Sequence, residues 1–336
     1  MHLKSALDIL PCGLFLEVRD ILPDTPVQLK LEGLSLSGSI KIKPAIHMLA
    51  ALERSGRLRP GMHVIESSSG NLGLALSMAC AVKGYAFTCV SDKNISPQTA
   101  QLIQTYGARL IVVREPDSNG GFLGTRIALI KTMLERDRQA IWLNQYENEH
   151  NAEAHYLSTG PELLAQFPAP DFVFVGAGTT GTLGGVSRYL REHAPAARII
   201  AVDSEGSVTF GGAPGKRHIP GLGTSQPPPI RALSSFDQLL MVPELDTVRM
   251  CHTLARRGLL LGGSSGTVLC GVQRHAAKIP AGACVVAIAP DMGDRYVDTI
   301  YNPEWLQAHF PALELNPAPT HTHTHTHTHS HTEQSC

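Results

Sequence analysis

The sequence predicts an α/β protein built on two open, twisted and mostly parallel sheets flanked by helices. Short apolar runs alternate along the chain with amphipathic helical segments, an order that is typical of parallel sheets covered on both faces. The alternation starts a second series after Tyr146, and a chain of 336 residues suits two lobes at roughly 100–200 residues per domain. Two sheets, one for each series, are therefore expected.

The first series begins with a short strand, Val27–Leu31, that follows a Thr-Pro turn. Pro44 suits the first turn of a helix, and the apolar face of that helix stops at Gly56. The series continues with strands and helices that alternate, namely His63–Glu66, Asn71–Lys83, Ala86–Val90, Pro97–Tyr106, Arg109–Val113, Leu123–Arg136 and Ala140–Leu143.

The second series contains a long irregular passage. Before and after this passage we expect helices and strands in the order Gly160–Gln166, Phe172–Val175, Leu183–His193, Arg198–Val202, Gln238–Val242, a helix ending at Gly258, Thr267–Ile279 and Cys284–Ala289. Residues 206–229 are rich in glycine and proline and show little periodicity. A structureless stretch of that length inside a compact domain is typical of a functional loop.

Composition narrows the classes of function. The formal net charge is −1, which gives no electrostatic basis for binding nucleic acid or an anionic membrane. Lys4 and Asp8 interrupt the start of the chain, so it does not have the pattern of a signal peptide, and no apolar run is long enough for a membrane span. The seven cysteines show no paired spacing, which predicts reduced core thiols in a cytoplasmic protein.

A Ser-x-Lys stretch precedes the first helix. In Gly38-Ser39-Ile40-Lys41 the lysine stands at the mouth of that helix, where its amine could carry a cofactor aldehyde. Lys43, two residues later, is the rival for this role. For either lysine the alternative is a solvated surface side chain.

Four loops are expected at the sheet edge where open α/β proteins bind ligands, outside the carboxyl ends of the strands. They span residues 67–73, 176–182, 262–266 and 290–293. The second carries Gly178-Thr179-Thr180-Gly181-Thr182 at the start of a helix, so that N–H groups and hydroxyls converge on a seat for phosphate. It lacks the Gly-Lys-Ser/Thr of a Walker A loop, and a tight structural turn is the alternative.

Together these loops resemble those of the fold-type II pyridoxal-phosphate enzymes, in particular the cysteine synthase family. The likeness runs from about Thr25 to about Leu306 and is carried by Glu66-Ser-Ser-Ser-Gly-Asn-Leu-Gly73, the Gly/Thr loop and Gly262-Gly-Ser-Ser-Gly266 in the expected order. It implies a large cofactor-binding domain of residues 1–42 and 147–314, a smaller domain of residues 43–146, and a homodimer. The implied substrates are small amino acids.

The resemblance also implies roles for individual residues. Lys41 would hold the cofactor, pyridoxal 5′-phosphate, take the α-proton of the substrate and return it later. Gly178, Thr179, Thr180, Gly181 and Thr182 would bind the cofactor phosphate, and Asn71 its ring hydroxyl. Ser264 would face the pyridine nitrogen, where a neutral hydroxyl suits β-elimination better than an acidic group would. Ser68, Ser69 and Gly70, with Asn71, would bind the substrate carboxylate. Helix capping is the alternative for Ser68, Ser69 and Asn71.

Further stretches resemble the branch of the family that joins O-phospho-L-serine to the amine of L-glutamate in siderophore biosynthesis. They are Thr88–Val90, Ile95–Pro97, Glu115–Asp117, Gly120–Gly121, Thr125–Ala128, Asn144–Tyr146, Gly206–Val208, Pro220–Gly223, Pro290–Asp291 and Gly293–Tyr296. Arg126 and Tyr146 are candidates for binding the additional anionic group of such substrates; a surface arginine and a half-buried tyrosine are the alternatives. Gly178 instead matches cysteine synthases, so a sulfur nucleophile stays open.

The C-terminal stretch differs in kind from the rest. In residues 315–336 six histidines, from His321 to His331, alternate with Thr or Ser, which predicts a disordered tail that could bind Zn, Ni or Cu weakly. No metal is expected in the chemistry above. A metal-binding protein on a catalytically silent fold is the alternative of a different class.

Overall fold

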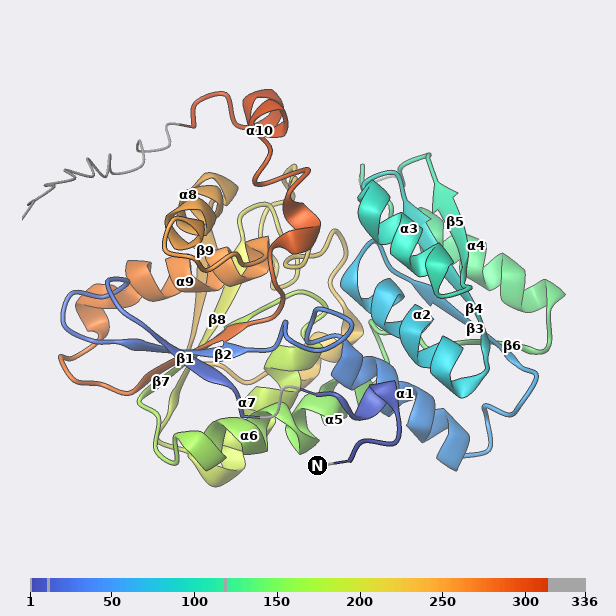
Figure 1. Cartoon of the computed structure of the whole chain (residues 1–336), viewed down its shortest axis with the longest axis horizontal. Coiled ribbons are helices and arrows are strands. Elements are labelled where there is room, and N and C mark those ends of the chain that lie inside the picture. The colour runs from blue at the N-terminus through green and yellow to red at the C-terminus, as the bar shows by residue number, and fades with distance from the viewer. Residues whose placement is uncertain (1, 11–12, 118–119, 314–336) are drawn as a thin grey trace, which may run out of the picture.

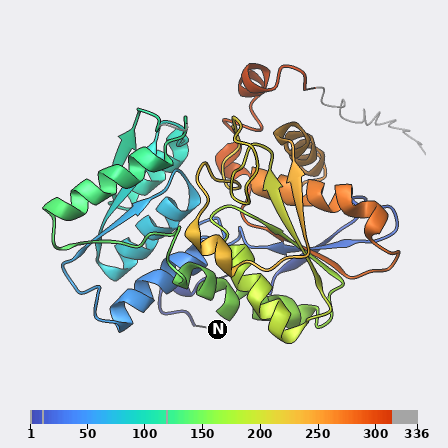
Figure 2. The same cartoon turned by 180° about the vertical axis from the view of Figure 1, so that it is seen from behind.

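Two open sheets, each flanked by helices, lie side by side in the protein (Figure 1). The computed structural model describes residues 2–10, 13–117 and 120–313. The view from behind shows the same division into two lobes (Figure 2). The predicted fold class is confirmed.

The larger sheet has six strands in the order β1-β2-β10-β7-β8-β9. All neighbouring pairs are parallel except β1 and β2. The strands are β1 (Phe15–Val18), β2 (Val27–Leu31), β7 (Phe172–Gly176), β8 (Arg198–Ser204), β9 (Gln238–Val242) and β10 (Val285–Ala289). Strands from the two ends of the chain therefore pair in the middle of one sheet.

The smaller sheet has four strands, all parallel, in the order β5-β4-β3-β6. They are β3 (His63–Ser67), β4 (Ala86–Asp92), β5 (Arg109–Val113) and β6 (Ala140–Trp142). Successive residues of β3 pack into different cores: Val64 lies in the core with α1 and α2, and Ile65 lies in the core with α4. The two central strands, β3 and β4, are buried on both faces along nearly their whole length, as expected for a parallel sheet covered by helices.

The helices connect the strands and cover both faces of each sheet. They are α1 (Ile42–Arg54), α2 (Asn71–Lys83), α3 (Pro97–Thr105), α4 (Leu123–Arg136), α5 (His150–Leu157), α6 (Thr159–Gln166), α7 (Gly181–His193), α8 (Glu244–Ala255), α9 (Gly263–His275) and α10 (Pro303–His309). Four short 3₁₀ segments are η1 (Ala6–Asp8), η2 (Pro229–Leu233), η3 (Ala276–Lys278) and η4 (Asp294–Tyr296). Within the described residues, no helix is long and apolar enough to cross a membrane.

Alternate side chains of β7 pack into two different cores, one on each face of the larger sheet. Phe172 and Phe174 pack with side chains of α8 and α9, whereas Val173 and Val175 pack with side chains of α6 and α7. This is the period of two that a strand imposes on its side chains. Four cysteines, Cys80, Cys89, Cys251 and Cys270, are buried and free, in agreement with the predicted core thiols.

One predicted boundary differs from the structure in a way that matters for the site. Residues 263–266 are the first turn of α9 instead of part of a loop, because contacts with the loop after β10 outweigh the weak helix propensity of glycine and serine. The sequence also did not predict α5, which has only eight residues, nor β1 and α10.

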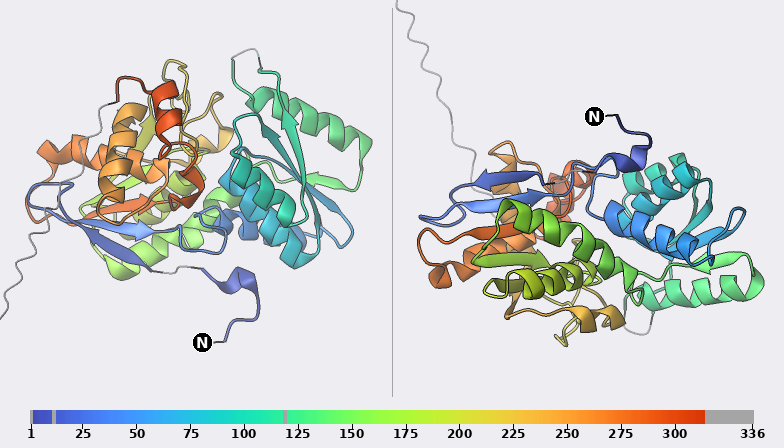
Figure 3. Two further views of the ribbon diagram at one scale, coloured as in Figure 1. Left: turned by 45° about the horizontal axis from the view of Figure 1, so that its top comes forward. Right: turned by 90° about the horizontal axis from the view of Figure 1, so that it is seen from below.

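Helix α1 and the N-terminal segment lie where the two lobes meet. Helix α1 packs against α2 of the smaller lobe and against α5. Ala6, Leu7 and Leu10, in and beside η1, pack against the core of the smaller sheet, and both views of Figure 3 show this segment leaving the strands of the larger sheet. The domain boundaries at residues 42/43 and 146/147 stay a prediction.

Candidate active site

The loop that carries Lys41 lies against the loop that follows β10. Ile40 donates its backbone N–H to the carbonyl of Pro290 at 2.7 Å, and Ser39 forms an isolated bridge with Asp291. Lys41 is the N-cap residue of α1, as predicted. Its amine is thereby held at the carboxyl end of the larger sheet.

Burial changes the acidity of Lys41. Desolvation lowers the pKa of its ammonium group from 10.5 to about 8, although the negative charge of Asp291 opposes this shift. Within the described residues, Lys41 Nζ forms no hydrogen bond or ion pair. A large share of this amine is neutral near pH 8, and the neutral form is the nucleophile and base.

Lys43 has a different environment. Its Nζ lies 2.8 Å from Glu32 Oε1 and 2.8 Å from Glu162 Oε2. Lys30 Nζ contacts the same two carboxylates at 3.0 and 2.6 Å. Lys43 is thus one member of a buried cluster of two lysines and two glutamates, where a neutral amine would leave buried carboxylate charge uncompensated.

Asp291 is the centre of a hydrogen-bond network between the two lobes. Its carboxylate is fully buried and accepts a hydrogen bond from Asn71 Nδ2 at 2.7 Å, from Ser264 Oγ at 3.1 Å and from the Tyr296 hydroxyl. Asn71 opens α2 of the smaller lobe, and Ser264 lies in the first turn of α9 in the larger lobe. One carboxylate therefore brings two predicted cofactor-binding residues together.

The loop between β3 and α2 has a closed side and an open side. Ser68 Oγ accepts hydrogen bonds from the backbone N–H groups of Gly70 at 3.2 Å and Gly73 at 2.9 Å, so Ser68 caps this turn. Ser69 and Gly70 are half-buried, and a Cβ added at Gly70 would meet no atom within 4 Å. Asn71 does not cap the helix; its side chain reaches Asp291.

The Gly/Thr loop ends at the first turn of α7. Thr180 has a positive φ of 72°, which is rare for a β-branched residue. A Cβ at Gly181 would lie 2.2 Å from Asn151 Oδ1, and one at Gly178 would lie 2.6 Å from the Gly221 carbonyl. The first N–H groups of a helix have no partner within it and meet the positive end of its dipole, so the turn can hold an anion.

The irregular passage predicted at residues 206–229 packs over this turn. Gly223 donates its N–H to the Ala177 carbonyl at 2.8 Å. A Cβ at Gly221, where φ is +110°, would lie 3.3 Å from Ser264 Oγ. The passage therefore contacts both the phosphate turn and the start of α9, and a side chain at Gly221 would be strained.

Arg126 is buried at the end of the smaller sheet, with 7% of its surface exposed, so the alternative of a surface arginine is wrong. Its Nε lies 3.5 Å from Asp92 Oδ2, beyond good hydrogen-bond distance. Among the described residues, Arg126 Nε and Nη1 and the nearby Ser91 Oγ have no hydrogen-bond partner. Tyr146 is also buried, which raises the pKa of its hydroxyl.

Three residues to which the sequence assigned no role are part of the site. Asp291 lies in the stretch Pro290–Asp291, which resembles the siderophore branch of the family but to which the resemblance assigned no role. Asn151 Nδ2 contacts Thr179 Oγ1 at 3.3 Å, and His155 Nε2 lies 3.2 Å from Thr182 Oγ1. Both come from α5, and no sequence signal marked them because that helix was not predicted.

Comparison with known proteins decides the family. The sequence pattern of the pyridoxal-phosphate dependent enzymes matches residues 17–291. The chain belongs to this family. It is a fold-type II enzyme of the cysteine synthase group, a β-replacement transferase whose cofactor is pyridoxal 5′-phosphate. The alternative of a catalytically silent fold is set aside.

Similar proteins carry out related chemistry. The chain is 41% identical over 279 residues to the N-(2-amino-2-carboxyethyl)-L-glutamate synthase of Ralstonia nicotianae, which covers 82% of each chain. Among solved structures, it is 28% identical to O-ureido-L-serine synthase, with a TM-score of 0.81 over 89% of this chain and 95% of that one. It is also 28% identical to the O-acetylserine dependent cystathionine β-synthase of Helicobacter pylori, with a TM-score of 0.82 over 90% and 100% of the two chains.

The residues present suit this cofactor. An amine with a pKa of about 8 can condense with an aldehyde, and the first backbone N–H groups of α7, which have no partner within the helix, can hold a phosphate. Ser264 Oγ donates a hydrogen bond to Asp291 Oδ1 at 3.1 Å, and its side chain is an uncharged hydroxyl. A cradle, an amine and a neutral hydroxyl are thus available.

Proposed function

We propose that this enzyme joins O-phospho-L-serine and L-glutamate to give N-(2-amino-2-carboxyethyl)-L-glutamate and phosphate, as a precursor of L-2,3-diaminopropionate for a siderophore or related metabolite. Two observations support the proposal. The chain is 41% identical to a synthase of that name, and a buried arginine with unfilled hydrogen-bond donors lies at the end of the smaller sheet. The first observation carries most weight because it concerns the substrate pair.

Lys41 is the acid–base group of the proposal. Bound pyridoxal phosphate would withdraw electrons from the substrate and so weaken the bonds at its α- and β-carbons. The Lys41 amine, with a pKa of about 8, takes the α-proton before the phosphate leaves. It returns a proton to the same carbon after the glutamate nitrogen has bonded to the β-carbon, and glutamate loses one amine proton.

The other predicted residues bind and orient. Ser69 and Gly70, on the open side of the β3–α2 loop, direct donors at the substrate carboxylate, and Ser68 holds that loop in shape. Asn71 and Ser264 would hold the cofactor ring. The turn from Gly178 to Thr182 binds the cofactor phosphate.

Arg126 is the residue that favours a substrate with an extra anionic group. The Nε and Nη1 donors of this guanidinium have no hydrogen-bond partner among the described residues, and arginine is a frequent partner of carboxylate and phosphate oxygens. Burial makes unfilled donors costly, so a ligand that fills them gains affinity. Sulfide offers no such group, whereas glutamate and O-phosphoserine do.

A cysteine synthase reaction, with sulfide as nucleophile, is the second candidate. Gly178 favours it, since cysteine synthases have glycine at the matching position and the siderophore branch has serine. In this chain a Cβ at residue 178 would lie 2.6 Å from the Gly221 carbonyl. The turn therefore excludes serine unless residue 221 moves.

Substrate pairs test the two candidates directly. O-Phospho-L-serine or O-acetyl-L-serine would be mixed with L-glutamate or sulfide, and the products measured by mass spectrometry and phosphate release. We expect the phosphoserine–glutamate pair to give the highest kcat/KM. A higher kcat/KM for sulfide with either serine ester would overturn the proposal.

The Arg126→Met variant tests the role of the guanidinium. Loss of a hydrogen-bonded charge contact costs about 1.5–3 kcal/mol, so we expect KM for glutamate or for O-phosphoserine to rise about 10- to 150-fold while KM for O-acetylserine with sulfide stays unchanged. Arg126→Lys is the matched control, because it keeps the positive charge and loses the planar guanidinium group. If the KM values for both anionic substrates stay unchanged in Arg126→Met, Arg126 does not bind substrate.

We also propose that the enzyme is a homodimer, as its family resemblance implies. The chain has a mass of 36.1 kDa, so light scattering of the full chain should give about twice that mass. A mass of one chain would overturn this proposal.

A further inference from the structure

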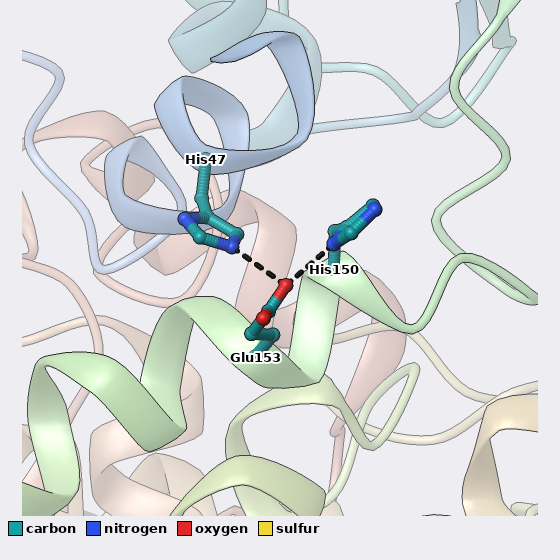
Figure 4. Close-up of side chains that lie close together, drawn as sticks. All are labelled: His47, His150 and Glu153. Atoms are coloured by element: carbon teal, nitrogen blue, oxygen red, sulfur yellow. Dashed lines mark hydrogen bonds and ion pairs between the residues drawn. The ribbon is translucent and has the colours of Figure 1, made fainter. Parts of the chain in front are cut away.

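Two histidines and a glutamate converge between α1 and α5 (Figure 4). Glu153 Oε2 lies 2.9 Å from His47 Nε2 and 2.5 Å from His150 Nδ1. One ligand atom from each residue lies within 4.8 Å of the other two. His150 and Glu153 are three residues apart on α5 and so share one face of it, and His47 approaches from α1.

This set of side chains has the chemistry of a zinc ligand set. Two imidazoles and one carboxylate are the three protein ligands of many sites in which Zn²⁺ keeps a fourth position for water. Both rings already point a nitrogen at the same carboxylate oxygen. A divalent ion could take the place of the hydrogens between them after small side-chain rotations, with both imidazoles neutral.

Solvent reaches the cluster from one side. A cavity of about 900 Å³ lies between β6 and α5, and His150 and Glu153 form part of its wall. The side chains are half-buried, with exposed fractions of 18% for His47, 44% for His150 and 42% for Glu153. An ion therefore has an access route and room for a water ligand.

We propose that His47, His150 and Glu153 form a binding site for a divalent transition metal of the Zn²⁺ class. The site would join α1 to α5. Helix α1 begins directly after Lys41, and α5 carries Asn151 and His155, which contact the phosphate turn. Metal binding would hold both elements in place and so slow release of the cofactor; this second effect rests on the proposed cofactor site, but the metal site itself does not.

The six C-terminal histidines must be replaced before Zn²⁺ binding to His47, His150 and Glu153 can be measured, because their imidazoles would also bind Zn²⁺. A full-length protein with Ser in place of the six histidines of residues 321–331 keeps chain length and removes the competing imidazoles. Zn²⁺ would be titrated against a chromophoric chelator, and Co²⁺ binding followed by its visible absorption. We expect one ion per chain and a visible spectrum typical of four-coordinate cobalt.

Variants in this background identify the ligands. His150→Ala and Glu153→Gln should each weaken Zn²⁺ binding about 100-fold or more, since even the outer partners of metal ligands contribute 10- to 100-fold. His193→Ala, at an exposed histidine on α7, is the control and should bind Zn²⁺ normally. Circular dichroism verifies that each variant is folded. No stoichiometric binding, or equal binding by all three variants, would overturn the metal site.

Cofactor release tests the coupling separately. Zn²⁺ should slow the loss of the cofactor's long-wavelength absorbance during dialysis against a competing amine, and this effect should vanish in His150→Ala. If Zn²⁺ binds at one ion per chain and the release rate stays the same, the coupling is wrong and the metal site stands. If the protein takes up no cofactor, the proposed cofactor site fails, and Zn²⁺ titration still decides the metal site.

Discussion

At the scale of single residues, environment separates side chains that the sequence places close together. Lys41 and Lys43 are two positions apart, yet Lys41 has a lowered pKa and Lys43 is paired with Glu32 and Glu162. Asp291 gathers Asn71 and Ser264 from opposite lobes. Chemistry at each position thus depends on which partners the fold supplies.

Substitution of the two lysines should have opposite effects. Lys43→Met breaks a buried ion cluster and should lower the free energy of unfolding by about 3–5 kcal/mol, while cofactor still becomes attached to the protein. Lys41→Met should change stability little and abolish the attachment. Urea unfolding measures the first effect, and borohydride trapping with mass spectrometry measures the second. Trapping lost in a folded Lys43→Met protein but kept in Lys41→Met would reverse the assignment.

From the lowered pKa of Lys41 we predict how the rate of cofactor uptake depends on pH. The neutral amine is the reactive form, and its share falls tenfold for each pH unit below the pKa. The rate at which cofactor-free protein takes up pyridoxal phosphate should therefore rise with pH, reach half of its maximum near pH 8 and level off above that pH. A lysine with an ordinary pKa of 10.5 would keep gaining rate beyond pH 9.

An Asp291→Asn variant tests whether the electrostatic environment of Lys41 sets the pH dependence of cofactor uptake. Asp291 raises the pKa of Lys41 and so opposes the effect of burial. Without its charge, the rate should level off at a lower pH than in the unsubstituted protein. A shift to higher pH would contradict the electrostatic explanation.

At the scale of elements, helix N-termini form the site. Helices α1, α2, α7 and α9 each begin at or beside a residue predicted to bind cofactor or substrate. Helices α2 and α7 directly follow strands β3 and β7, and the first turn of α9 contacts the loop after β10, so these helix starts lie at the carboxyl ends of strands. Helix α5 then packs against α1 and α7 and supports the phosphate turn through Asn151 and His155.

Two glycines of α7 make a matched pair. A Cβ at Gly181 would lie 2.2 Å from Asn151 Oδ1, whereas one at Gly184 would meet its nearest atom at 3.4 Å. Gly181→Ala should weaken cofactor binding at least tenfold and cost about 1–3 kcal/mol of stability. Gly184→Ala should leave cofactor affinity unchanged. Fluorescence titration with pyridoxal phosphate compares them, and equal affinities would contradict the packing argument.

At the scale of the whole molecule, the site joins two sheets with separate cores. The hydrogen bond from Asn71 to Asp291 runs from the start of α2 to the loop after β10. Each lobe buries its own apolar side chains, so contacts of this kind control how the lobes move relative to each other. Lobe closure is how such enzymes exclude water from the reaction.

Removal of the Asn71 side chain should increase local opening of the backbone in both lobes. Asn71→Ala loses a hydrogen bond to a charged group, worth about 1.5–3 kcal/mol. Hydrogen exchange should become faster both at the start of α2 and in residues 290–296. Asn94→Ala, at an exposed position of the smaller lobe, should change neither segment. Faster exchange confined to α2 would show that the contact does not couple the lobes.

The sequence by itself determined the fold class, most elements and the order of the binding loops, because these depend on local periodicity and on glycine, serine and threonine placed after strands. The start of α9, the existence of α5 and the two environments of Lys41 and Lys43 depended on tertiary contacts. Asp291, Asn151 and His155 entered the site only in three dimensions, and so did the cluster of His47, His150 and Glu153. Their partners lie far away in the chain or on a helix without a sequence signal, and burial and charge at such positions come from packing.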